Sequence, residues 1–166
     1  MQQLITFAIF SLLVLLLCLV RPVAGRIFLG IFFLVMAIGV NVVLVLLSPD
    51  LFVGLGTNDA LIPLYRWFFE NIVAAPSLFG LLAAAYEVAI ALLMLSKGRY
   101  VKWGLIGSIV FLIAITPLGV WTLANPILAV AMTYLLTKEY EWSLSETLRL
   151  PARPRRQQRW ERRQPR

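Results

Sequence analysis

A single acidic residue, Glu87, lies in the middle of an apolar run that extends from Ser77 to Ser96 and holds no other charge. The run is long enough to cross a bilayer as an α-helix. Because a carboxylate at that depth is costly, Glu87 is expected to face a protein interior and to have polar partners. The run therefore predicts one helix of a membrane bundle with a buried acid.

Small side chains share the helical face of Glu87, at steps of three, four or seven residues. They are Gly80, Ala83, Ala84 and Ala91. Leucines occupy the opposite side, at Leu78, Leu82, Leu92 and Leu93. Small residues let helices approach closely in lipid, so the Glu87 face is predicted to be the packing face.

The composition supports a membrane protein and limits its chemistry. The 166 residues are 61% hydrophobic, well above the apolar share of soluble domains. The chain has no histidine and one cysteine, Cys18, which is expected to be a packing residue. A metal or haem site and a histidine-based catalytic site are therefore not expected, and the chain is predicted to carry no cofactor of its own.

Five apolar segments are predicted to be membrane helices. They are residues 4–20, 27–47, 77–96, 101–120 and 126–137. The connectors 21–26 and 97–102 and the region beyond Thr137 are basic, whereas the connectors between them are acidic or uncharged. Because basic connectors face the cytoplasm, the N-terminus is predicted to lie outside and the C-terminus inside.

The first segment could instead be a cleaved signal peptide. It lacks a basic n-region and an A-x-A cleavage site, so we favour a retained helix. The last segment is short, and Asn125 with Pro126 is predicted to form its N-cap and first turn.

The outer connector, residues 48–76, is long for a compact bundle. It begins with a glycine-containing stretch at 54–56 that is expected to be flexible, followed after Pro63 by an amphipathic, aromatic-rich helix. Such helices often lie in the membrane interface. The helix either covers the bundle or acts as a lid over a cavity. The candidate lid residues are Tyr65, Trp67 and the i, i+4 pair Arg66 and Glu70.

The C-terminal tail from Leu150 is rich in Pro, Arg and Gln, a composition that predicts disorder. It carries most of the net charge of +7. The tail is either a topology signal or a contact for anionic lipid, and nucleic-acid binding is not expected. The candidate lipid contacts are Arg153, Arg155, Arg156, Arg159, Arg162 and Arg163.

Polar or small residues also form stripes on the other predicted spans. Facing stripes would make a polar seam, whose candidate members are Glu87, Asn41, Ser108, Thr116 and Thr133.

Two interpretations of this seam remain. In the structural one, a protonated Glu87 donates a hydrogen bond to Asn41 or to a carbonyl freed by Pro117. In the functional one, Glu87 exchanges protons or contacts a small amphipathic ligand such as a quinone headgroup.

Two stretches resemble the DoxX-like family of small integral membrane proteins. One is Arg-Ile-Phe-Leu-Gly-Ile-Phe-Phe, which starts at Arg26, and the other is the Glu87 helix with its Leu-rich end running into Lys97-Gly98-Arg99. The resemblance covers residues 26–137. It implies an all-α protein, an antiparallel four-helix transmembrane bundle, here with one extra N-terminal helix (residues 1–25) and a basic tail (residues 138–166). It also implies a bacterial cytoplasmic membrane.

The family constrains the fold more than the activity. Its members include small subunits of quinone-linked oxidoreductases and assembly factors. We therefore expect a non-enzymatic accessory or assembly subunit that docks on other membrane subunits or on its own copies. The alternative is a subunit of a membrane oxidoreductase that binds quinone or lipid and uses Glu87. A transporter ranks below both because we find no inverted repeat.

Overall fold

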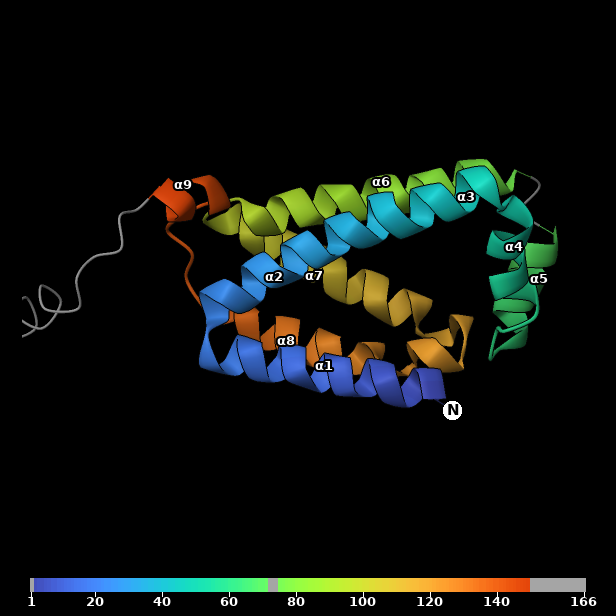
Figure 1. The fold of residues 1–166 in the computed structure, drawn as a ribbon, viewed down its shortest axis with the longest axis horizontal. Helices are drawn as coiled ribbons and strands as arrows, with labels where there is room; N and C mark the ends of the chain where they lie inside the picture. The colour runs from blue at the N-terminus through green and yellow to red at the C-terminus, as the bar shows by residue number, and fades with distance from the viewer. Residues whose placement is uncertain (1, 72–74, 150–166) are drawn as a thin grey trace, which may run out of the picture.

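All secondary structure in residues 2–71 and 75–149, the part of the chain that the computed structural model describes, is helical (Figure 1). The elements in chain order are α1 (Gln2–Val20), α2 (Pro22–Val35), the π-helix η1 (Met36–Val42), α3 (Val43–Leu47), α4 (Pro49–Thr57), α5 (Pro63–Asn71), α6 (Pro76–Leu95), α7 (Arg99–Ile115), the 3-10 turns η2 (Thr116–Leu118) and η3 (Val120–Ala124), α8 (Asn125–Leu136) and α9 (Leu144–Arg149). The predicted all-α class is confirmed for these residues.

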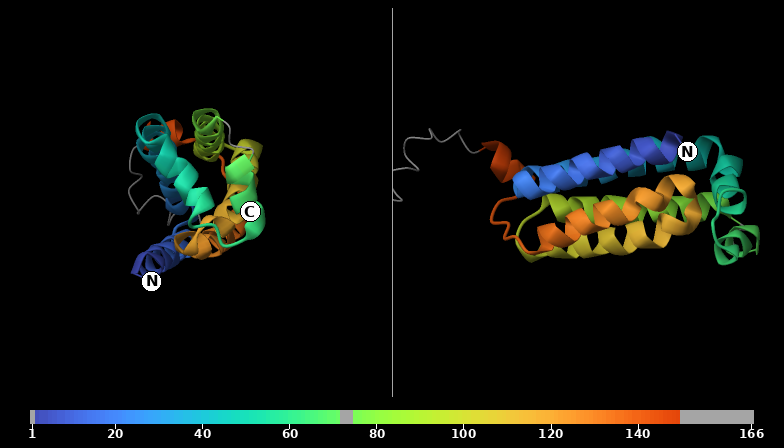
Figure 2. Two further views of the ribbon diagram at one scale, coloured as in Figure 1. Left: turned by 90° about the vertical axis from the view of Figure 1, so that its right-hand side faces the viewer. Right: turned by 90° about the horizontal axis from the view of Figure 1, so that it is seen from below.

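The long helices lie side by side in alternating directions (Figures 1 and 2). Within the described residues, four helices are long and apolar enough to cross a membrane: Gln2–Val20, Pro22–Leu47, Pro76–Leu95 and Arg99–Leu118. The shorter apolar helix Val120–Leu136 runs beside them. Helices α4 and α5 lie across one end of the bundle, and α9 lies at the other (Figure 2). We call these the α5 end (residues 49–71 and 116–124) and the α9 end (residues 21, 96–99 and 137–149).

Prolines set where several of these helices begin. Pro22, Pro49 and Pro76 each stand in the first turn of a helix, where the missing N–H is not needed. Because α2 begins at Pro22, Arg26 belongs to a helix and not to a connector, which corrects the sequence prediction.

The glycine-containing stretch 54–56 is also not a flexible loop, because it lies in α4. A Cβ on Gly56 would stand 2.0 Å from the ring of Phe69 on α5, so this glycine lets the two helices pack closely.

The bundle core is built from apolar side chains of α1, α2, α6, α7 and α8. Helix α1 packs against α8, η3 and α2, and α6 packs against α2, η1 and α7. Glycines mark close approaches between α6 and its neighbours, as two examples show. A Cβ on Gly80 would lie 2.1 Å from Cγ2 of Val45, and one on Gly104 would lie 2.6 Å from the backbone nitrogen of Met94.

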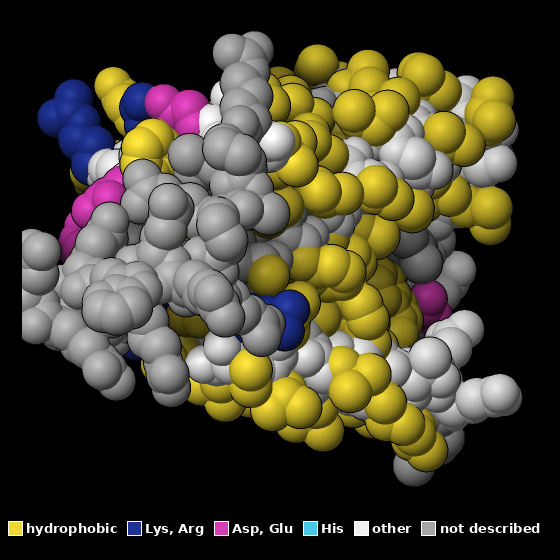
Figure 3. Space-filling model, turned by 60° about the vertical axis from the view of Figure 1, so that its left-hand side comes forward, with side chains coloured by type: hydrophobic (Ala, Val, Ile, Leu, Met, Phe, Trp, Pro, Cys, Tyr) yellow, Lys and Arg dark blue, Asp and Glu magenta, His cyan; other side chains and the backbone are white. Residues whose placement is uncertain are grey.

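Leucines and other large apolar side chains cover the outside of the bundle. Leu78, Leu82 and Leu92, predicted to oppose Glu87, are more than half exposed. Figure 3 shows hydrophobic side chains spread over the helices, with charged side chains gathered towards the α9 end. This surface matches the environment of a lipid bilayer and not of water.

Helix α7 ends at Ile115, two residues before Pro117, and two 3-10 turns then lead into α8. Carbonyls in the last turn of α7 accept hydrogen bonds from side chains. Thr116 and Asn125 donate to the carbonyl of Leu112, and Tyr65 donates to the carbonyl of Ala114. Asn125 is therefore not the N-cap that the sequence predicted. The η3 turn runs directly into α8, and the buried amide of Asn125 points to α7 instead.

Candidate functional site

The central feature of the bundle is a hydrogen-bonded pair between Glu87 on α6 and Asn41 on η1. The side-chain amide of Asn41 donates to Oε2 of Glu87. Glu87 is only 4% exposed. The sequence predicted the buried placement and offered Asn41 as one of two alternative partners, the other being a carbonyl freed by Pro117. The donor is Asn41, however, whereas the structural interpretation had Glu87 donating.

The π-helix η1 explains how Asn41 reaches this position. Ala37 and Val45 are both fully buried, although they are eight residues apart. In an ideal α-helix a step of eight residues turns about 80° away from the starting face. The wider turn of residues 36–42 keeps both on the side that faces α6, and it places Asn41 there as well. Single-turn π segments are frequent at functional sites.

The other predicted seam residues do not join this pair. Ser108 is fully buried, but its hydroxyl donates to the carbonyl of Gly104 and lies 3.6 Å from Sδ of Met94. Thr116 donates to Leu112 on its own helix. The structure thus brings two of the five predicted residues together.

Thr133 does not line the seam, which corrects the prediction. It is exposed, and its hydroxyl donates to the carbonyl of Ala129 one turn earlier. A step of four residues drifts about 40° around an α-helix, so the stripe that starts at Asn125 has left the buried face at Thr133. The buried face of α8 is Leu128, Ala129, Ala131, Met132 and Leu135.

Among the candidate lid residues, Tyr65 forms a hydrogen bond with another helix. Its hydroxyl donates to the carbonyl of Ala114, which ties α5 to the C-terminal turn of α7. Arg66, Trp67 and Glu70 are exposed. The predicted Arg66–Glu70 pair is not formed, since the ion pairs of the described residues are Lys97–Glu146 and Lys102–Glu139. The predicted tail arginines, Arg153 to Arg163, lie outside the described residues.

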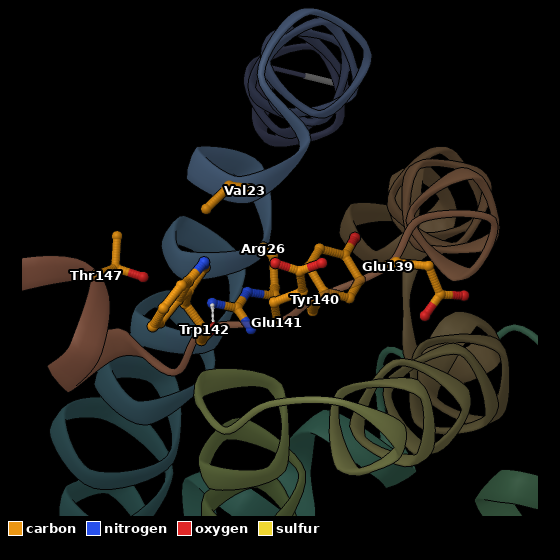
Figure 4. A pocket seen from close by; sticks show the side chains of 7 residues that line it. All are labelled: Val23, Arg26, Glu139, Tyr140, Glu141, Trp142 and Thr147. Carbon is orange, nitrogen blue, oxygen red and sulfur yellow. Dashed lines mark hydrogen bonds between the residues drawn. The ribbon is translucent and has the colours of Figure 1, made fainter. Parts of the chain in front are cut away.

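A second buried charge, Arg26 on α2, lies near the α9 end. It is fully buried, and its guanidinium donates to the carbonyls of Ser96 (2.8 Å) and Trp142 (3.0 Å). The same group lies 4.9 Å from the ring centre of Tyr140 (Figure 4). Arg26 therefore joins the start of α2, the end of α6 and the segment after α8.

The segment after α8, residues 137–143, folds back across the α9 end. The amide of Gly98 donates to the carbonyl of Tyr140 at 2.7 Å. Burial raises the pKa of Tyr140 to about 12, so its hydroxyl stays neutral and donates to the carbonyl of Leu135. Ser143 and Glu146 then form a capping box that starts α9.

Sequence analysis missed this second cluster. Arg26 was read as one of two charges in a connector, although Pro22 marks a helix start four residues before it. The Ser143-x-x-Glu146 pattern was a signal for a further short helix.

The described residues contain no group of three or more His, Cys, Asp or Glu side chains that could hold a metal ion. An open pocket lies beside Arg26, bordered also by Val23, Glu141, Trp142 and Thr147 (Figure 4).

The fold and these two clusters define a class, a polytopic helical protein whose apolar helices suit a lipid bilayer. No family model, no curated protein and no solved structure matches the chain.

Proposed function

We propose that this protein is an accessory or assembly subunit of a larger membrane complex, with no catalytic activity of its own and a DoxX-like bundle. The observation that carries the proposal is that the central acid, Glu87, is buried and hydrogen-bonded within the bundle. Glu87 is almost completely enclosed and accepts a hydrogen bond from Asn41, so it holds α6 to η1. A side-chain hydrogen bond between two membrane helices stabilises their packing.

Docking on partners would use the outer faces of the helices and the α5 end. The latter carries aromatic and aliphatic side chains that are exposed, among them Leu64 and Trp67. Helix packing in lipid needs shape-matched surfaces and few charges, which these faces provide.

The orientation that we propose places the N-terminus outside and the C-terminus in the cytoplasm of a bacterial membrane. The α9 end is rich in Lys and Arg, whereas the α5 end holds Asp50, Asp59 and Glu70 against Arg66. This separation follows the positive-inside rule. A thiol probe that does not cross membranes should label Asn58→Cys from outside and leave Ser145→Cys unlabelled in intact cells. The opposite pattern would reverse the orientation.

A second candidate function is binding of a quinone or lipid headgroup in an oxidoreductase complex. The π-helix at Asn41 favours it, because such segments often mark functional sites. In this case Glu87 would exchange protons or contact the headgroup, with Asn41 as its neighbour.

Glu87→Gln separates the two functions. The amide keeps the size and hydrogen-bonding capacity of the acid but cannot exchange a proton at physiological pH. The accessory function predicts normal folding and normal recovery of partner subunits in mild detergent. Normal folding with complete loss of quinone-dependent turnover in the purified complex would favour the second function and contradict the first.

A further inference from the structure

We propose that the pocket beside Arg26 binds the headgroup of a zwitterionic phospholipid, a phosphate linked to a primary ammonium as in phosphoethanolamine. Arg26 supplies the positive charge of this pocket and Glu141 the negative charge (Figure 4).

Arg26 has unused hydrogen-bonding capacity. A guanidinium has five N–H donors. Two nitrogens donate to the carbonyls of Ser96 and Trp142, and Nε has no partner. No carboxylate of the described residues forms an ion pair with Arg26. Among the described residues, its positive charge is opposed by carbonyl dipoles and the face of Tyr140, and an anion next to it would gain a charge-assisted hydrogen bond.

The two carboxylates at the pocket, those of Glu139 and Glu141, differ in their ion pairing. Glu139 accepts from Lys102 at 2.9 Å, and Figure 4 shows its carboxylate directed away from Arg26. Glu141 is exposed and is in neither ion pair of the described residues. Within residues 2–71 and 75–149, the pocket therefore presents one cation and one anion that have no ion-pair partner. Glu141 disfavours a simple anion and Arg26 disfavours a simple cation, whereas a zwitterion satisfies both.

The location fits a lipid headgroup. The pocket lies where α2 begins, at the end of the apolar span Pro22–Leu47. Val23 and Trp142 are each about half exposed, 47% and 50%, and provide an apolar border on which the first acyl carbons can lie. Tryptophan is enriched at this depth of a membrane. Arg26 is fully buried, so a side chain at the pocket border must move before a phosphate reaches the guanidinium.

The test uses the full-length protein in mild detergent with an equimolar mixture of phosphatidylethanolamine and phosphatidylglycerol of identical acyl chains. Bound lipids are counted by native mass spectrometry. We expect enrichment of phosphatidylethanolamine. Glu141→Gln should lower the enrichment by about two- to fivefold, the usual worth of one exposed carboxylate–ammonium pair. Glu70→Gln, an exposed glutamate at the α5 end, is the matched control and should leave it unchanged.

Retention of the two lipids in the proportion of the mixture would overturn the proposal. Equal enrichment in Glu141→Gln and Glu70→Gln would overturn it as well. Arg26→Gln should reduce binding of both lipids, and Arg26→Lys should restore part of it, because a charge at this position attracts phosphate. If the Arg26 variants do not fold, as judged by size-exclusion chromatography, the glutamate variants decide the outcome.

A further arm distinguishes the lipid from a soluble molecule with the same charged groups. Glycerophosphoethanolamine is added to the delipidated protein in competition with the lipid. We expect displacement only at large excess, because the soluble molecule lacks the acyl contacts with Val23 and Trp142. Binding that the lipid fails to displace would assign the pocket to a soluble headgroup and overturn the lipid proposal.

Discussion

Arg26 and Glu87 are both buried charges, on neighbouring helices, yet the chain holds them in different ways. Glu87 has one side-chain partner, Asn41, and lies in the middle of the bundle. Arg26 lies near the α9 end and is held by two main-chain carbonyls and an aromatic ring. Glu87 joins two segments of the chain, whereas Arg26 joins three.

This difference determines what a substitution leaves behind. A neutral amide opposite Glu87 can be removed together with the acid, so that no polar group is stranded. The carbonyls that face Arg26 belong to the backbone and remain whatever side chain replaces the arginine. Polar groups without partners are costly where water is excluded. We therefore expect the α9 end to depend more strongly on its charge than the centre of the bundle does.

The largest effect is expected for Arg26→Met, which keeps most of the volume and removes every donor. Two partly buried acceptors lose their partner, and about 1–3 kcal/mol each is the cost for full burial, so the expected loss of unfolding free energy is at most about 2–6 kcal/mol. Unfolding by a denaturing detergent, followed by circular dichroism, measures it. The control is Arg21→Met, an exposed arginine five positions earlier. Equal stability of the two variants would contradict the role given to Arg26.

The next effect concerns the packing that encloses Glu87. In Gly104→Ala the new Cβ would stand 2.6 Å from the nitrogen of Met94 and 2.8 Å from the carbonyl oxygen of Ile90. Because both atoms belong to the backbone of α6, the helices must separate, at a cost of about 1–3 kcal/mol. Gly39→Ala is the control, since its nearest neighbour is Cγ1 of Val35 at 4.0 Å. The same detergent titration should show a loss only for Gly104→Ala, and equal losses would mean that α7 does not pack closely on α6.

These two charges also show what the sequence could predict. Glu87 stands alone in a long apolar run, so the run itself predicts burial, and helical periodicity selects Gly80 and Ala84 as its face. Asn41 was predicted from a stripe on residues 27–47 that assumed a regular α-helix, whereas the π-helix η1 is what places it against α6. Arg26 stands at the edge of an apolar run, five positions after Arg21. Two arginines in such a position are typical of a connector between membrane helices. The burial of Arg26 depends on residues 137–143, which return from more than one hundred positions away.

Other features have no local signal. Nothing in the composition of residues 36–42 marks a π-helix, because the extra residue per turn is fixed by how the helix packs on α6. The prediction that Thr133 shares a buried face with Asn125 was wrong. Residues spaced by four drift around an α-helix, and the angular offset grows with each turn. Periodicity is thus reliable over one or two turns around a strong marker such as Glu87.

A smaller effect is expected for the Asn41–Glu87 pair itself. We predict a coupling free energy of about 0.6–1.7 kcal/mol from a double-mutant cycle of Asn41→Ala, Glu87→Ala and the double variant, the range measured for hydrogen bonds between membrane helices. The cycle uses the same unfolding measurement. Additive losses would mean that the two side chains do not interact, and a coupling as large as the Arg26 effect would remove the difference between the two sites.

The smallest effect concerns α9, next to the Arg26 cluster. Hydrogen bonds from Lys97 and Ser143 lower the pKa of Glu146 from 4.5 to about 2. A lowered pKa means that the carboxylate stabilises the docked α9 above about pH 4.5 and that this contribution is lost as the pH falls towards 2. A fluorophore on Ser145→Cys should therefore lose anisotropy within this window. Glu146→Gln should give low anisotropy throughout, because it lacks the carboxylate at every pH. A transition centred near pH 4.5 would instead mean that Lys97 does not hold Glu146, and that α9 is positioned by the Arg26 cluster alone.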